Sequence, residues 1–168
     1  MALTMYQAAF PITGRTLKAL ASILDKAATH CETRKIDPRT LLSYRMAPDM
    51  FDLKRQVQTV SDQAKGMAAR LAGVPIPSFP DVEETFAELL ERLTKTRDFL
   101  KSISESQLDG SETREIVLKL GGNEVTFTGR DYLFGFFMPN FYFHATATYT
   151  IVRHAGVEIG KRDFMGAR

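Results

Sequence analysis

Two stretches of the chain carry apolar residues at alternating intervals of three and four positions. The earlier stripe contains Met50, Leu53, Val57, Val60, Ala64, Met67 and Leu71. The later one contains Val82, Phe86, Leu89, Leu93, Thr96, Leu100 and Ile103. This spacing places one narrow apolar face along a helix, and such a face must be buried against neighbouring helices. The chain is therefore expected to fold with long helices packed side by side.

Turn and capping residues predict where these two helices begin and end. Pro48 suits the first turn of the earlier helix, and Gly73 is expected to end it. The linker VPIPSFP (74–80) is too rich in proline to be helical. Asp81 and Glu84 follow this linker and are expected to cap the later helix.

The N-terminal segment also has helical periodicity, over about Thr4 to His30. Thr4 and Gln7 have the spacing of a capping box, and Pro11 is expected to kink or delay the helix. One apolar stripe is formed by Leu17, Leu20, Leu24 and Ala27.

A different pattern follows the third helix. In REIVLKLGGNEVTFTG (114–129), apolar and polar residues alternate on both sides of a Gly-Gly-Asn turn. This pattern predicts a short β-hairpin. Because an isolated hairpin is marginally stable in water, it is expected to lie on the helices.

The last predicted helix runs from about Arg130 to Ala155, with Gly156 at the C-cap position. Its aromatic residues are Phe134, Phe136, Phe137, Phe141, Tyr142, Phe143 and Tyr149. They cannot all share one face at 3.6 residues per turn. We therefore expect a central helix covered on several sides, part of which meets a second copy in a homodimer.

Length and composition narrow the classes of protein. The 168 residues suit one domain over 1–168, and a net charge of +2 without a basic stripe argues against nucleic-acid binding. No apolar run approaches the roughly 20 residues of a membrane span, and the N-terminus does not resemble a signal peptide. The single cysteine, Cys31, cannot form an internal disulfide, and a cytoplasmic location is expected.

Candidate site residues cluster in PNFYFHATATYTIVRHAG (139–156). His144 is preceded by Asn140 at the i−4 position, so both share a helix face. His154 lies about 15 Å further along the axis and cannot join His144 at one metal ion. Pro139 either opens a pocket beside these residues or bends the helix round the core, and His144 is either a pocket residue or a buried core histidine.

Polar residues beside the second-helix stripe extend this set. Gln56 and Gln63 flank the stripe and are either polar groups at a pocket wall or solvated side chains. Asp49, Asp52 and Asp62 are carboxylates that could supply oxygen ligands to a metal.

The order of elements, with a long last helix closing on HATATYTIVRHAG, resembles the DinB/YfiT-like superfamily. Members of that superfamily hold nickel or zinc through a histidine on the second helix and an HxxxH pair on the last. In this chain the corresponding positions are Gln56, Asn140 and His144, so one of three ligands is present. The segments DMFDLKRQVQ, RLAGVPIP and GKRDFMG resemble an uncharacterised branch of the superfamily.

Together these observations predict an all-α, up-down four-helix bundle of the DinB/YfiT-like kind, with a small β-hairpin before the last helix. The site is expected to be a small polar pocket at His144, Asn140 and Gln56 that binds a small molecule, or acts in an interaction role, without a tightly held metal or other cofactor. The alternative is a metal-dependent hydrolase or thiol-dependent transferase in which His144 is a ligand of nickel or zinc.

Overall fold

Helix α1 (Met5–Arg34) begins with the capping box predicted from the sequence. Thr4 Oγ1 accepts a hydrogen bond from the Gln7 backbone amide, and the Gln7 side chain accepts one from the Thr4 amide. The helix runs through Pro11 and ends at Arg34 rather than His30. The computed structural model describes residues 3–166, so the first two and last two residues of the predicted 1–168 domain lie outside it.

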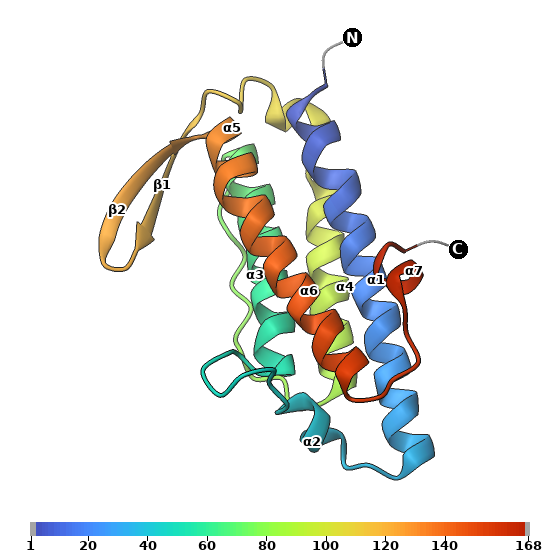
Figure 1. Cartoon of the computed structure of the whole chain (residues 1–168). Helices are drawn as coiled ribbons and strands as arrows, with labels where there is room; N and C mark the ends of the chain where they lie inside the picture. The colour runs from blue at the N-terminus through green and yellow to red at the C-terminus, as the bar shows by residue number, and fades with distance from the viewer. Residues whose placement is uncertain (1–2, 167–168) are drawn as a thin grey trace.

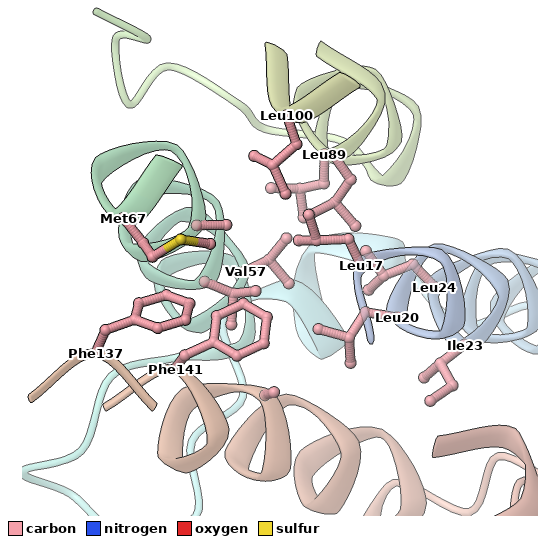
Figure 2. Close-up of a cluster of buried hydrophobic side chains, with 14 of the residues drawn as sticks. Leu17, Leu20, Ile23, Leu24, Val57, Met67, Leu89, Leu100, Phe137 and Phe141 are labelled. Carbon is pink, nitrogen blue, oxygen red and sulfur yellow. The ribbon is translucent and has the colours of Figure 1, made fainter. Parts of the chain in front are cut away.

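Three further long helices lie beside α1: α3 (Leu53–Ala72), α4 (Phe86–Ser102) and α6 (Met138–His154). Helix α1 packs against α4 and α6, and α3 packs against the same two helices (Figure 1). The apolar stripes predicted from the sequence meet in the space between them. Side chains from these helices and the segment before α6 that fill this core are labelled in Figure 2: Leu17, Leu20, Ile23, Leu24, Val57, Met67, Leu89, Leu100, Phe137 and Phe141.

Two predicted helix starts were wrong. Helix α3 begins at Leu53, with Asp52 as its N-cap, and not near Pro48. Helix α4 begins at Phe86, where Thr85 and Glu88 form a reciprocal capping box. In each case a side chain next to the first buried turn satisfies the free backbone amides, and the residues predicted to begin or cap the helix belong to the preceding loop. Consequently Val82, predicted in the α4 stripe, is 69% exposed.

Two short helical segments join the long ones. Helix α2 (Pro38–Leu42) is capped by Asp37 and buries Leu41 and Leu42. The 3₁₀ segment η1 (Glu105–Leu108) follows α4 and buries Leu108. Neither was predicted, because segments this short carry too few turns to show a helical period.

The predicted hairpin is present as strands β1 (Glu115–Leu120) and β2 (Asn123–Thr128). The strands are antiparallel, and Gly121 and Gly122 form the turn with φ values of 57° and 87°. Both values are positive, which a two-residue type I′ turn requires and glycine permits. Ile116 and Leu118 are buried, while the strands project to the side of the helices (Figure 1).

The last helical region is continuous from α5 (Gly129–Asp131) through the π-helical segment η2 (Tyr132–Phe137) to α6. Pro139 lies just beyond η2 and has no amide hydrogen to donate, and the change of helical spacing occurs at this point. The C-cap is Ala155 rather than Gly156, which follows with φ 89°. Phe137 and Phe141 face the core, whereas Phe143 is exposed.

The C-terminal segment crosses α1. Helix α7 (Lys161–Phe164) packs on α1, and the Phe164 ring meets that of Tyr149 with centroids 5.6 Å apart. Across residues 3–166, no helix combines the length and apolar character needed to cross a membrane.

Candidate functional site

His144 and Gln56 lie in direct contact between α6 and α3. Gln56 is in the first turn of α3 and is only 1% exposed, while His144 is half-buried on α6. The distance between His144 Nδ1 and Gln56 Oε1 is 2.7 Å. These two predicted site residues, which are far apart in the sequence, are therefore joined by a hydrogen bond.

Aromatic side chains flank the imidazole. The Phe51 ring, from the loop before α3, stacks on the His144 ring with centroids 6.0 Å apart and an interplanar angle of 16°. The Phe143 ring meets it edge-on at 5.2 Å. Gln56 Nε2 donates to the Phe51 carbonyl oxygen at 3.2 Å, and the Arg55 guanidinium lies over the Phe51 ring.

The environment of His144 favours its neutral form. Partial burial lowers the pKa of His144 below its ordinary value of 6.5, and the positive charge of Arg55 lowers it further. Within residues 3–166, His144 Nε2 has no hydrogen-bond partner, and the buried side-chain atoms left without one are Arg92 Nε and Ser111 Oγ. Nε2 is therefore accessible to solvent.

Asn140 lies one helical turn before His144 but is not bonded to it. Its Nδ2 donates to the Phe136 carbonyl oxygen of the same helix at 2.7 Å. This places its amide group beside the π-helical segment and next to Pro139. Its Oδ1 has no hydrogen-bond partner in the described part of the chain and can accept one.

A family model described as "Domain of unknown function (DUF1993)" matches residues 5–165. The chain belongs to the DUF1993 family. It is also similar to a crystal structure described as that of a DinB family member protein from Shewanella denitrificans, with 38% sequence identity and a TM-score of 0.90. The similarity covers 98% of this chain and 93% of that one, which confirms the DinB-like resemblance. A comparison with curated proteins found no match.

The resemblance to DinB proteins implies metal-ligand positions at Gln56, Asn140 and His144, and the first two side chains have other partners in this DUF1993 chain. Gln56 Oε1 is hydrogen-bonded to the His144 ring, and the Asn140 amide is bonded to its own helix. Carboxamide oxygens are also weaker ligands than imidazole for nickel or zinc. Over residues 3–166, no group of three or more His, Cys, Asp or Glu side chains could hold a metal ion. The residues present therefore do not fit the three-histidine centre of the superfamily.

The carboxylates considered as metal ligands have other roles in this DUF1993 fold. Asp52 is the N-cap of α3. Asp62 Oδ1 forms ion pairs with Arg92 at 2.7 Å and with Lys65 at 2.9 Å. Asp49 lies exposed in the loop before α3.

A buried charge cluster around Arg92 was not predicted. Arg92 is 2% exposed, and its guanidinium contacts Glu83 at 2.9 Å, Asp62 at 2.7 Å and Asp81 at 3.0 Å. Gln58 Nε2 donates to the second Glu83 oxygen at 2.8 Å. The one available signal was Arg92's position three residues after Leu89 on the buried face of α4. Arg92 also donates to the Pro80 carbonyl oxygen, so the cluster connects the end of the proline-rich linker to α3 and α4.

The remaining candidates lie outside this site. His154 is exposed at the end of α6, where its ring meets that of Tyr44 with centroids 5.7 Å apart. Cys31 is buried, and burial raises its pKa. Gln63 lines a surface cleft of about 300 Å³ between α3 and the hairpin.

Proposed function

We propose that this DUF1993 protein binds a small molecule at His144, Asn140 and Gln56, without a tightly held metal ion. The observation that supports the proposal is the accessible Nε2 of an imidazole whose other nitrogen is held by a buried side chain. Holding one ring nitrogen orients the second, which limits the freedom lost when a ligand binds.

The surroundings suggest the kind of ligand. Phe51 and Phe143 present ring surfaces on two sides of His144, which suits a small planar or apolar body. Asn140 adds a carbonyl oxygen one turn away on the same helix. A molecule of a few non-hydrogen atoms could contact both polar groups and one aromatic ring.

The proposal also covers the helix topology, the cellular location and the oligomeric state of the protein. We infer that the four long helices form an up-down bundle in a single domain over 1–168, and that the chain is cytoplasmic and forms a homodimer. Exposed Phe143 and Phe134 on the last helical region support a contact with a second copy.

A fragment titration tests the binding site. Uniformly ¹⁵N-labelled protein is titrated with phenol, indole and acetamide, and backbone amide shifts are followed. We expect saturable shifts centred on Gln56, Asn140 and His144 for at least one probe. His144→Ala should remove them, whereas the control His154→Ala, an exposed histidine on the same helix, should leave them unchanged.

If all three probes leave these residues unshifted, or if His144→Ala binds as the unaltered protein does, the proposal is wrong. Elemental analysis of protein purified without chelator tests the alternative function. About one equivalent of nickel or zinc, lost in His144→Ala, would favour a metal-dependent hydrolase or thiol-dependent transferase instead.

A further inference from the structure

The carbonyl oxygen of Phe51 determines how the Gln56 amide is turned. A backbone carbonyl can only accept, so the group 3.2 Å from it must be the NH₂ of Gln56. The reverse orientation would bring two acceptor oxygens face to face at a side chain that is 1% exposed. An unsatisfied buried polar group of this kind is strongly disfavoured.

This orientation in turn determines the hydrogen on His144. Gln56 Oε1 then faces Nδ1 of the ring at 2.7 Å, and an amide oxygen is also only an acceptor. Nδ1 must therefore carry the hydrogen. A neutral imidazole has one N–H, so Nε2 is left with a lone pair.

The loop that carries Phe51 is itself held in place. The Leu53 amide donates to the Tyr44 carbonyl oxygen at 2.9 Å, and Arg45 Nη1 donates to the Met50 carbonyl oxygen at 3.0 Å. These bonds fix the backbone on both sides of Phe51. The two hydrogen bonds that connect the Phe51 carbonyl, Gln56 and His144 therefore join groups whose positions are restrained.

We propose that Gln56 is a positioning residue that holds His144 in the Nδ1–H tautomer, so that Nε2 acts as an acceptor and the site selects ligands that bring an N–H or O–H donor. The part of this inference that concerns ligands rests on the proposed function. Asn140, one helical turn from His144, has a second free acceptor in its Oδ1, which favours donors for the same reason.

Nuclear magnetic resonance of the imidazole nitrogens tests the tautomer without any ligand. Two-bond and three-bond ¹H–¹⁵N correlations in the full chain at about pH 8, where histidine is neutral, identify which nitrogen is protonated. We expect the Nδ1–H pattern for His144. The exposed His154 is the internal reference in the same spectrum. An Nε2–H pattern for His144 would overturn the inference.

Two substitutions separate positioning from packing. Gln56→Met keeps the length and the buried contacts but removes the acceptor, so the His144 tautomer should change while the fold is retained. Gln56→Glu keeps an acceptor at Nδ1, so Nδ1 should remain protonated, although the second carboxylate oxygen faces the Phe51 carbonyl and this variant should be less stable. If Gln56→Met leaves the tautomer unchanged, Gln56 has no positioning role. If that variant fails to fold, the unaltered protein still tests the inference, because an Nε2–H pattern there would overturn it.

Matched probes test the selectivity. Phenol and anisole differ in the hydroxyl hydrogen, and one hydrogen bond corresponds to roughly a 2- to 12-fold difference in affinity. We expect phenol to bind more tightly than anisole by a factor in this range, and Gln56→Met to abolish the difference. Equal binding of both probes at His144 would overturn the donor selectivity while leaving the binding site intact. Absence of binding by either probe, with the Nδ1–H tautomer observed, would overturn the donor selectivity and count against the proposed function, while leaving the positioning role of Gln56 intact.

Discussion

Replacing Arg92 by methionine should destabilise the fold far more than the loss of an exposed charge on the same helix. Methionine has a similar length and keeps the packing beside the Phe79 ring, whose centroid lies 5.9 Å from the guanidinium carbon of Arg92. The substitution removes the positive charge that contacts Glu83, Asp62 and Asp81. Removing one partner of a buried ion pair costs about 3–5 kcal/mol, because the other charge is left buried.

The penalty should be concentrated at Glu83. The side chains of Asp62 and Asp81 are 39% and 36% exposed and can be hydrated, whereas that of Glu83 is 10% exposed. Burial alone raises the pKa of Glu83, but the hydrogen bonds from Arg92 and Gln58 outweigh it and the pKa is lowered overall. Without Arg92, an ionised Glu83 would lose its charged donor and keep only the neutral donors of the Gln58 side chain and its own backbone.

Urea unfolding followed by circular dichroism at about pH 7 measures the effect. Relative to the unaltered protein, Arg92→Met should lose about 3–5 kcal/mol. In thermal melting this corresponds to a decrease of roughly 6–20 °C for a chain of this size. The control is Lys95→Met, which removes a charge from an exposed pair with Glu91 on the same helix and should change stability by at most about 0.5 kcal/mol.

The double variant identifies the cause. Adding Glu83→Gln to Arg92→Met removes the unpaired carboxylate charge and should recover part of the lost stability. Glu83→Gln alone should be destabilising. If Arg92→Met costs less than about 1 kcal/mol, or if the double variant is no more stable than Arg92→Met, the reasoning from a buried unpaired carboxylate is wrong.

Three further predictions concern backbone space, pH and assembly. A β-carbon at Gly129 would lie 1.8 Å from the Ser111 carbonyl oxygen, so Gly129→Ala should lose about 1–3 kcal/mol or more in urea unfolding. Gly135→Ala, where nothing lies within 4 Å, should gain up to about 1 kcal/mol, and a similar loss in both variants would contradict the steric argument. The pKa of His144 is lower in the fold than its unfolded value of 6.5, so the unfolded chain binds more protons below about pH 6.5. The free energy of unfolding should therefore decrease as the pH is lowered below about 6.5. His144→Gln should reduce this slope in urea midpoints measured between about pH 5 and 7.5, and an unchanged slope would count against a neutral ring. Sedimentation at micromolar concentration should give about twice the chain mass of 18.9 kDa, and a monomer would remove the dimer proposal.

Much of the helical framework could be predicted because its signals are local. The stripes around Val57 and Leu93, the capping box at Thr4 and the Gly-Gly turn each depend on residues within a few positions of one another. The predicted starts of α3 and α4 were wrong because several possible caps precede each apolar stripe. The choice of Asp52 and Thr85 depends on where the loops leave the helices.

The candidate site was only partly predictable. The resemblance to DinB proteins placed Gln56 opposite His144, and the structure joins them. It did not show that Asn140 would turn to the Phe136 carbonyl, which depends on the helical spacing before Pro139. The buried cluster was missed because Glu83 and Arg92 resemble solvated charges until the linker folds over α4.

By itself, the sequence determined which faces of the long helices are buried and where the hairpin turns, because periodicity and turn chemistry act between near neighbours in the chain. The tertiary structure alone decided the chemical state of the polar residues. The hydrogen on His144 depends on an amide 88 positions away and on a carbonyl in a separate loop. Hydrogen bonds and ion pairs weaken steeply with distance in space, so their partners are known only once the helices and loops are packed.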